Sequence, residues 1–465
     1  MSRRSRPAPT VGILGVGYMG IATGLGFAAR GRTVWAYDIN PRVRASLRRG
    51  RSPYAERGLP ELLRQETRRG RFRVVDSLAE LAARAEGIFL CVPTPPRRNG
   101  EVDLGPLRSA VRALGEALRP VRGYRVVVVK STVVPGTTDE VVEPVLRRAS
   151  GRDSRALGLA VNPEFLSEGR MVEDALRPAR IVVGARDPRA RRMLRAIYAG
   201  FPAPVLDLPP AGAELVKHGS NEFLALKVSY ANELARWSER LGTDVDPIVD
   251  AIGTDPRIGK AFLRAGPGFG GSCFDKDLRA FERRGGALGL APRIPSAVLA
   301  INDDQTAHAV ELVRSAVPSL RGRRVAVLGL AFKVGTDDVR ESRAFPIVER
   351  LLAAGARVRV HDPSALGNFR TAWERRGRGR AIEFARSVPR ALAGADLAIV
   401  QADWPAYVRW KPAWTRAMRS PMVVDLRRGI DPGLARRRGL TVVALGRGTP
   451  PAPRPAGRRT GRRRR

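Results

Sequence analysis

Short runs of apolar, mostly β-branched residues recur along the first 200 residues, and stretches of helical length separate them. These runs are predicted strands at 11–14, 33–37, 87–92, 125–129 and 181–183. A glycine-rich turn and a helix through Arg30 follow the first strand. Strands that alternate with helices form a parallel sheet with helices on both faces. The pattern therefore predicts a doubly wound α/β domain over residues 1–202.

The middle of the chain follows a different period. From residue 213 to about 242, apolar residues recur at helical spacing and form a wide apolar surface. A second helical region follows Cys273 and extends to about Val317. We therefore expect an all-helical domain over residues 203–318.

The alternation of strands and helices resumes in the last third of the chain. Segments 324–332, 357–363 and 395–403 repeat the design of the first domain, with a strand entering a glycine turn and a second strand ending in aspartate. They predict a second doubly wound domain over 319–445. The remaining segment, 446–465, is rich in glycine, proline and arginine, a composition typical of a disordered basic tail.

The chain is strongly basic, with 83 lysines and arginines against 45 acidic residues and a net charge of +38. The arginines are spread along every segment, and net charge speaks to solubility and non-specific binding rather than to fold. We expect no specific nucleic-acid partner, but a nucleic-acid-binding protein that uses its basic tail stays open as an alternative of a different class. Two cysteines in 465 residues argue against a disulfide framework and favour a reducing compartment.

An uncharged apolar run covers residues 11–29 and lies behind three arginines, a pattern shared with signal peptides and membrane spans. Six glycines inside this run, and the following strand that ends at Asp38, favour a buried strand, turn and helix instead. No other stretch is long and apolar enough to span a bilayer. We therefore expect a cytoplasmic protein without a membrane span.

The first glycine turn has the pattern of a dinucleotide site. Gly15 permits the turn, Gly17 lets a pyrophosphate approach the backbone, and Gly20 permits close helix packing, while the helix N-terminus faces the phosphates. Asp38 ends the second strand, where a carboxylate binds the ribose hydroxyls and favours NAD over NADP. Arg42 nearby leaves NADP open.

A second motif surrounds Cys273, which lies in a turn of small residues and is followed by Lys276 and Asp277. A thiol on a tight turn, with a cation and a carboxylate close behind it, is typical of a covalent nucleophile. A packed core, where an inert cysteine would lie, rarely contains such a turn. Cys91 ends an apolar strand, and we interpret it as structural.

Three further pairs and segments add polar chemistry. Glu164 and Glu168 are four residues apart, so on a helical turn they would share a face, although a solvated pair is the alternative. Lys217 and Asn221 have the same spacing on the long predicted helix. Thr132 follows a run of valines, at the carboxyl end of a strand where α/β sheets bind ligands. Together these residues supply a base, an oxyanion partner and hydroxyl donors.

We predict no metal site. The three histidines, His218, His308 and His361, show no metal-ligand spacing and are assigned no chemistry. The sequence also shows no Ser-His-Asp arrangement.

Taken together, these segments resemble the UDP-glucose/GDP-mannose dehydrogenase family. The similarity covers nearly the whole chain, and its most specific parts read NPEFLSEG, AELVKHGSNEFLALK, GFGGSCFDKD and LGLAFKVGTDDVRES. The resemblance implies two doubly wound Rossmann-like domains joined by a central all-helical domain. The first would bind NAD, the central one would form a homodimer or higher homo-oligomer, and the last would bind UDP. It also implies oxidation of a nucleotide-sugar C6 alcohol to the carboxylate with two NAD.

The motifs and the resemblance together assign roles to individual residues. The expected catalytic residues are Cys273, Lys217, Asp277, Asn221, Glu164 and Thr132. The expected cofactor-binding residues are Gly15, Gly17, Tyr18, Met19, Gly20, Asp38, Arg42, Thr94, Thr132, Glu168, Lys276 and Arg340. The expected substrate-binding residues are Glu164, Phe165, Leu166, Lys217, Asn221, Arg257, Phe269, Gly270, Lys333 and Arg427.

By the same resemblance, Cys273 forms a thiohemiacetal and then a thioester with the substrate. Lys217 steadies the oxyanion with Asn221 beside it, and Asp277 and Thr132 order the hydrolytic water. The sequence around the nucleophile is most similar to the UDP-glucose branch, which leaves GDP-mannose or another nucleotide sugar as the alternative substrate. A catalytically inactive nucleotide-sugar sensor is a third possibility, against which the complete set of reactive residues argues.

Two positions depart from the family pattern. Asp275 stands where proline is usual, and Leu426 stands where glycine is usual. A carboxylate close to Cys273 is expected to raise the pKa of the thiol.

Overall fold

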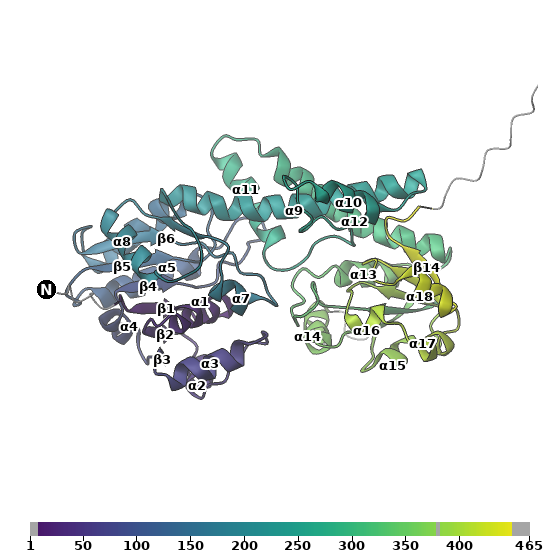
Figure 1. The fold of residues 1–465 in the computed structure, drawn as a ribbon, viewed down its shortest axis with the longest axis horizontal. Helices are drawn as coiled ribbons and strands as arrows, with labels where there is room; N and C mark the ends of the chain where they lie inside the picture. Colours follow the sequence, from purple (N-terminus) through teal and green to yellow (C-terminus); the bar gives the residue numbers. More distant parts are fainter. Residues whose placement is uncertain (1–7, 378–381, 449–465) are drawn as a thin grey trace, which may run out of the picture. The chain divides into compact units, whose positions relative to one another are not determined.

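The computed structural model of the protein describes residues 8–377 and 382–448. The described residues fall into two compact units. The first comprises the described residues up to Phe223, together with Ser272–Ser296 and Gly335–Asp337; the remaining described residues form the second. Each unit contains one sheet (Figure 1).

The first unit is built on an eight-stranded sheet with the strand order β3-β2-β1-β4-β5-β6-β7-β8. Its strands are β1 (Val11–Leu14), β2 (Val34–Tyr37), β3 (Phe72–Val74), β4 (Gly87–Leu90), β5 (Arg125–Val129), β6 (Leu157–Val161), β7 (Ile181–Gly184) and β8 (Val205–Leu208). All neighbours are parallel except β6 and β7, which pair antiparallel at a single position, Val161 with Gly184. The expected parallel doubly wound sheet is therefore confirmed, with one antiparallel junction that the sequence did not indicate.

Helices cover both faces of this sheet. They are α1 (Tyr18–Ala29), α2 (Pro41–Arg48), α3 (Leu59–Arg68), α4 (Leu78–Arg84), α5 (Gly105–Leu118), the π-helix η1 (Thr138–Val142), α6 (Glu143–Ser150), α7 (Met171–Leu176) and α8 (Pro188–Ile197). Alternation along β5 explains the two layers, because successive strand residues point to opposite faces. Val126 and Val128 join the core that contains α1, whereas Val127 and Val129 join the core that contains α5.

The second unit contains a six-stranded, fully parallel sheet in the order β11-β10-β9-β12-β13-β14. Its strands are β9 (Arg324–Leu328), β10 (Arg357–His361), β11 (Ile382–Phe384), β12 (Leu397–Val400), β13 (Met422–Asp425) and β14 (Thr441–Ala444). Its order is that of the first six strands of the other sheet, so the prediction of a second domain of similar design is confirmed. In such a sheet a crevice forms at the carboxyl ends of the strands, at the point where the strand order reverses. These folds bind their ligands there.

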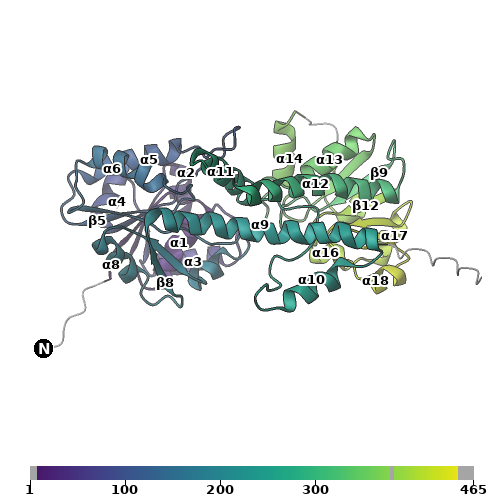
Figure 2. The same cartoon turned by 90° about the horizontal axis from the view of Figure 1, so that it is seen from above.

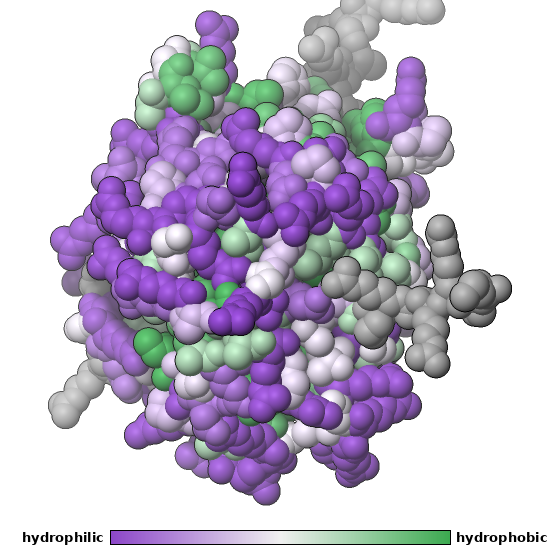
Figure 3. All heavy atoms as spheres, turned by 90° about the vertical axis from the view of Figure 1, so that its left-hand side faces the viewer, coloured by the Kyte–Doolittle hydropathy of each residue, from purple (hydrophilic) through white to green (hydrophobic). Residues whose placement is uncertain are grey.

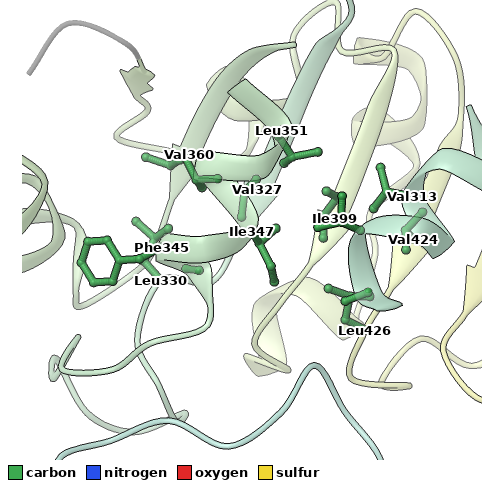
Figure 4. Packing of buried hydrophobic residues seen from close by; sticks show 14 of the residues in the cluster. Val313, Val327, Leu330, Phe345, Ile347, Leu351, Val360, Ile399, Val424 and Leu426 are labelled. Atoms are coloured by element: carbon green, nitrogen blue, oxygen red, sulfur yellow. The ribbon is translucent and has the colours of Figure 1, made fainter. Parts of the chain in front are cut away.

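The helices of this second sheet are α13 (Ala344–Ala353), α14 (Leu366–Arg375), α15 (Val388–Leu392), α16 (Pro405–Val408), α17 (Pro412–Ala417) and α18 (Pro432–Arg437). Ile347 and Leu351 of α13 lie in one core cluster with Val327 of β9 and Val360 of β10 (Figure 4). Leu426, which follows β13, is fully buried in the same cluster. The leucine that stands here in place of the usual glycine therefore fills space in the hydrophobic core of the second unit.

The middle of the chain is helical, as expected. Its helices are α9 (Pro210–Leu241), α10 (Val245–Thr254), α11 (Phe274–Ala287) and α12 (Arg293–Ala316). α9 runs unbroken for 32 residues (Figure 2). However, these helices do not form a separate compact body, because α11 belongs to the first unit and α10 to the second, and the boundary falls within α9 after Phe223.

Two local predictions need correction. The segment with Glu164 and Glu168 is an irregular loop after β6, so the two carboxylates do not share a helical face. Most of the tail predicted at 446–465 lies outside the described residues. Its first residues are held in place, however: Gly446 donates its backbone N–H to Glu239 and Arg447 pairs with Asp244.

The apolar run at 11–29 folds as β1 and α1 and is buried in the core of the first unit, which excludes the interpretation as a membrane span. Over the described ranges, no helix combines the length and the apolar character needed to cross a membrane. The face of the first unit drawn in Figure 3 is mostly hydrophilic, with apolar residues in small islands.

Candidate active site

The glycine turn between β1 and α1 has the geometry of an anion site. Gly15 has φ +92°, and a Cβ there would lie 2.7 Å from the carbonyl oxygen of Cys91. A Cβ on Gly20 would lie 2.0 Å from the carbonyl oxygen of Gly15. Among the described residues, no atom lies within 4 Å of a Cβ built on Gly17, and no side chain caps α1. The start of the helix is therefore open to a phosphate, which fits a dinucleotide.

Asp38 lies beside this turn at the end of β2. Its Oδ2 accepts the N–H of Val16 at 2.7 Å, and its Oδ1 accepts the N–H of Asn40 at 2.9 Å. The carboxylate is half-buried, and each oxygen keeps a second lone pair that a ribose hydroxyl can use. Arg42 is exposed in α2, and the structure leaves its part in cofactor choice a prediction.

The other expected cofactor residues of the first unit surround the carboxyl ends of the strands. Tyr18 contacts Tyr54, with ring centroids 4.5 Å apart, and Met19 packs on the core. Thr94 follows β4 and donates its hydroxyl to the carbonyl oxygen of Thr132, which follows β5, at 2.9 Å. The two threonines are thus brought together at the edge where parallel sheets bind ligands.

Cys273 is the residue from which α11 begins, and it is exposed. Its sulfur lies 3.7 Å from the hydroxyl oxygen of Ser272. Cys91 is buried, and burial raises the pKa of its thiol to about 12, which agrees with a structural role. Of the two cysteines, only Cys273 is placed to react with a ligand.

Two charged contacts lie close to Cys273 in the same unit. The Lys217 ammonium donates to Glu164 Oε1 at 2.9 Å, and Glu164 also accepts the N–H of Leu166 at 2.6 Å. Asp277 accepts from the Asn221 amide at 2.7 Å and from the Lys276 ammonium at 2.6 Å. The side chains of Lys217 and Asp277 are almost fully buried, at 5% and 2% exposed, so each charge depends on these partners.

The electrostatic balance keeps Asp277 and Lys217 ionised. Burial opposes the charge of Asp277, but the ammonium groups of Lys276 and Lys217 outweigh it and hold its pKa below the usual value. Burial likewise opposes the charge of Lys217, but Glu164, Asp277 and Cys273 raise its pKa. The site therefore contains a fixed cation and a fixed anion.

The thiol of Cys273 responds in the opposite way. The protein packed around it raises its pKa above the usual value, and the charge of Asp277 adds to this effect, while Lys217 lowers it. Asp275 is paired with Arg279 through two contacts of 2.9 and 3.0 Å. Loss of hydration beside the surrounding protein and the charge of Asp277 account for the raised pKa, so the expected contribution of Asp275 is not needed.

Alkylation of Cys273 by iodoacetamide should therefore accelerate by up to about tenfold per pH unit and should still be rising at pH 9, because only the thiolate reacts. Asp277→Asn should accelerate the reaction at pH 8 by roughly threefold or more, and Lys217→Met should slow it similarly, since each change removes one charge acting on the thiol. Mass spectrometry gives the labelling rate. Cys273→Ala is the control and should remain unlabelled; a rate independent of pH would contradict the raised pKa.

The helix α9 positions more of the site than the sequence indicated. Glu214, almost fully buried, accepts the N–H groups of Gly136 and Thr138 at 2.6 and 2.9 Å and thereby fixes the start of η1. His218 contacts the carbonyl oxygens of Val133 and Asp277. Both residues were missed. Glu214 lies three residues before Lys217 on the same helix, a spacing that could have found it, whereas a histidine without metal-ligand spacing gave no such signal for His218.

The loop after β6 contributes three more expected residues. The Arg180 guanidinium lies 3.9 Å from the centre of the Phe165 ring, and Leu166 and Glu168 belong to the same loop. A cavity of about 160 Å³ adjoins Phe165, Glu164 and Lys130. It is too small for a nucleotide sugar, since ligand sites usually occupy about 300–1,000 Å³.

The remaining predicted substrate residues belong to the second unit. The backbone of Phe269 is held by the Asn302 amide, which accepts its N–H at 2.7 Å. A Cβ on Gly270 would lie 2.4 Å from the carbonyl oxygen of Glu341, so only glycine fits there. The Arg427 guanidinium donates to the carbonyl oxygen of Gln401 at 2.8 Å.

Three predicted phosphate or cofactor cations of this unit are exposed. Lys333 follows the turn after β9. Arg257 and Arg340 each pair with an aspartate two residues earlier in the chain. These pairs have to open before either arginine can hold a phosphate, and the roles of all three stay predictions.

The glycine turn of the second unit also has a carboxylate beside it. Asp362 accepts the N–H groups of Leu330 and Ala331 through Oδ2 and those of Ser364 and Ala365 through Oδ1, at 2.7–3.1 Å. The indole of Trp404 adds a fifth donor at 3.3 Å. In the two described ranges, no group of three or more metal-ligating side chains could hold a metal ion.

Three domain models of one family match the chain in order. They are described as the NAD binding domain, the central domain and the UDP binding domain of the UDP-glucose/GDP-mannose dehydrogenase family, and they match residues 9–202, 211–304 and 326–432.

Individual relatives agree with this match. The chain is 41% identical to the UDP-glucose 6-dehydrogenase AglM of Haloferax volcanii, over 93% of this chain and 99% of that protein. It is 34% identical to a GDP-mannose 6-dehydrogenase of Pseudomonas putida, over 76% of this chain and 80% of that protein. A solved UDP-glucose dehydrogenase from Pyrobaculum islandicum is 40% identical and superposes with a TM-score of 0.88, over 96% of this chain and 100% of that one.

Proposed function

The chain belongs to the UDP-glucose/GDP-mannose dehydrogenase family, and on this premise we propose that it oxidises UDP-glucose to UDP-glucuronate with NAD. One observation carries the proposal. Cys273 starts α11 in the same compact unit as the glycine turn, within electrostatic reach of Lys217, Asp277 and Glu164. This arrangement joins a covalent nucleophile to a dinucleotide site.

The open turn at Gly17, the uncapped start of α1 and the Asp38 carboxylate fit NAD. Bound NAD supplies the acceptor for each of the two hydrides. Overall, the C6 alcohol, two NAD⁺ and one water become the carboxylate, two NADH and three protons. Both hydrides leave the same carbon, so the aldehyde has to stay in the site between the two oxidations.

Cys273 holds that aldehyde. Its thiolate adds to C6, and the carbonyl oxygen takes a proton to give a thiohemiacetal. Loss of the second hydride from C6 and of the hydroxyl proton gives a thioester. Water then attacks the carbonyl, the carbon–sulfur bond breaks, and the carboxylate and the free thiol result.

The charged residues serve these steps. The Lys217 ammonium, with the Asn221 amide one turn further along α9, stabilises the oxyanion that forms at C6. Asp277 is ionised, so it can accept a proton from the attacking water, which Thr132 helps to orient. Glu164 accepts the proton that the C6 hydroxyl loses in the first oxidation. The raised pKa of Cys273 means that the thiol has to lose its proton in the site, and Lys217 favours this.

Substrate choice is tested with purified protein, NAD and a panel of UDP-glucose, GDP-mannose and UDP-N-acetylglucosamine. We expect the highest kcat/KM with UDP-glucose, with two NADH formed per sugar and a carboxylate product seen by mass spectrometry. A preference for GDP-mannose would overturn the substrate assignment alone. No NADH from any nucleotide sugar would overturn the proposed function.

We further propose a homodimer formed through α9. In the second unit, Tyr230, Trp237 and Leu241 are 47%, 61% and 64% exposed, and their spacing of seven and eleven residues places them on one side of the helix. Exposed apolar stripes of this kind mark interaction surfaces. Trp237→Asp should convert a dimer into a monomer in light scattering after gel filtration, whereas Leu206→Asp, at another exposed apolar residue, should not. An unchanged assembly in the Trp237 variant would contradict this interface.

The protein is further proposed to act in the cytoplasm, because both cysteines are free and one of them has to be reduced to react.

A further inference from the structure

His218 lies on α9 between the two residues of that helix that carry the proposed chemistry. It is 2% exposed, and its ring is stacked on Phe281 with centroids 5.6 Å apart. Its Nε2 lies 3.0 Å from the carbonyl oxygen of Val133, and its Nδ1 lies 3.3 Å from the carbonyl oxygen of Asp277. The imidazole therefore stands between two segments that are 144 residues apart in the chain.

Each of these segments carries a reacting group of the proposed mechanism. Val133 directly follows Thr132, and Asp277 lies in the first turn of α11, which begins from Cys273. Other residues of α9 hold the same two segments: Glu214 binds the backbone beyond Val133, and Asn221 binds the Asp277 carboxylate. His218 contacts the backbone of both segments with one side chain, and Arg284 of α11 adds a more distant link by donating to the carbonyl oxygen of Pro135 at 2.8 Å.

In a hydrogen bond with either of these carbonyl oxygens, the donor must be His218. Carbonyl oxygens only accept, so the imidazole has to donate. Burial lowers the pKa of His218, although Asp277 opposes this effect. A neutral ring carries one N–H, and the shorter contact assigns it to Nε2 and to the Val133 carbonyl. This hydrogen bond fixes the backbone next to Thr132, while the ring packs against α11.

We propose that His218 is a positioning residue that ties the Thr132 segment to α11, so that Thr132 and Asp277 are held at the spacing needed for hydrolysis of the thioester. The inference rests on the proposed function. It predicts a defect in the last chemical step, because Thr132 and Asp277 act together there on the hydrolytic water.

A matched pair of variants separates positioning from packing. The amide nitrogen of glutamine lies near the position of Nε2 and can still donate to Val133, whereas that of asparagine lies near the position of Nδ1 and cannot. We expect His218→Gln to keep kcat within about threefold and His218→Asn to lower it by roughly 10- to 100-fold, with kcat/KM for UDP-glucose unchanged because the slowed step follows formation of the thioester. His218→Phe, which keeps the ring stacking but no donor, should behave like the asparagine variant.

The decisive measurement follows NADH during the first turnovers and the mass of the protein. In His218→Asn we expect a burst of about two NADH per active site and accumulation of a substrate adduct on Cys273, because the thioester forms but is hydrolysed slowly. His308→Gln, at a histidine of α12 outside the site, is the control and should show neither. Melting temperatures of all variants identify any that fail to fold.

Three results would overturn the inference: wild-type rates in His218→Asn and His218→Phe, a slow variant without burst or adduct, or equal losses in the glutamine and asparagine variants. If one variant does not fold, the other two still decide between these outcomes. Wild-type protein that forms no NADH from any nucleotide sugar contradicts the proposed function itself. Wild-type turnover with unaffected His218 variants contradicts only the role of His218.

Discussion

Cys273→Ser should lower the formation of UDP-glucuronate by at least about a thousandfold, since a serine hydroxyl is a far weaker nucleophile and cannot form the thioester. The first oxidation does not use the thiol, so NADH should still form slowly, at one rather than two per sugar consumed. The measurement is NADH per sugar, together with chromatography of the product. The expected product of the variant is at the aldehyde level or is retained on the protein.

Cys91→Ala is the matched control for this experiment, because it removes the other thiol from the buried end of β4. Its turnover should remain close to that of the wild type once any loss of stability is corrected by the fraction folded. Full formation of the carboxylate by Cys273→Ser would rule out the covalent step, and with it the role of the turn at the start of α11.

Lys217→Met should lower kcat by about 100- to 1,000-fold, the usual cost of removing a charge that stabilises an oxyanion. The ammonium is buried and pairs with Glu164 at 2.9 Å, so its removal also leaves a carboxylate without its cation. Such a loss typically costs about 3–5 kcal/mol of folding free energy. A melting curve measures that effect separately from kcat.

Lys411→Met provides the comparison for Lys217→Met, since Lys411 is exposed and lies in the second unit. It should change neither kcat nor the melting temperature. A Lys217 variant that melts earlier but retains kcat in its folded fraction would show that the ammonium serves only stability, and the oxyanion would then need another partner.

The fold could be predicted where buried apolar residues recur along the sequence with a clear period. The valines of β5 predicted a strand buried on both faces, and the long apolar stripe after residue 210 predicted α9. Shorter strands such as β3 and β11, three residues each, have no such signal and depend on the neighbours with which they pair. The boundary between the two units falls within α9, where helical periodicity continues without interruption.

The loop with Glu164 shows why spacing alone misled. Four residues separate Glu164 from Glu168, but Pro163 disfavours helical backbone in the residue before it, and Glu164 binds the N–H of Leu166 in its own loop. The carboxylate instead meets Lys217 from a distant part of the chain. Such a pairing requires knowledge of which segments pack together.

The nucleophile and the dinucleotide turn were visible in the sequence because each depends on a short run of glycines and small residues. His218 was not visible, because a histidine without ligand spacing has no local signature. Its proposed role depends on its contacts with two backbone carbonyl oxygens, that of Val133 in the segment after β5 and that of Asp277 in α11. Residues that act through the backbone of others are thus the ones that a single sequence conceals.

The two aspartates beside the glycine turns differ in remaining acceptor capacity. Asp362 receives five donors from its own unit, which saturates its lone pairs, whereas Asp38 receives one donor on each oxygen. Although the two sheets share one strand order, of these two carboxylates only Asp38 keeps acceptor capacity for a hydroxyl of a bound nucleotide. A change of coenzyme preference therefore requires substitution of Asp38. Substitution of Asp362 should instead lower the free energy of unfolding.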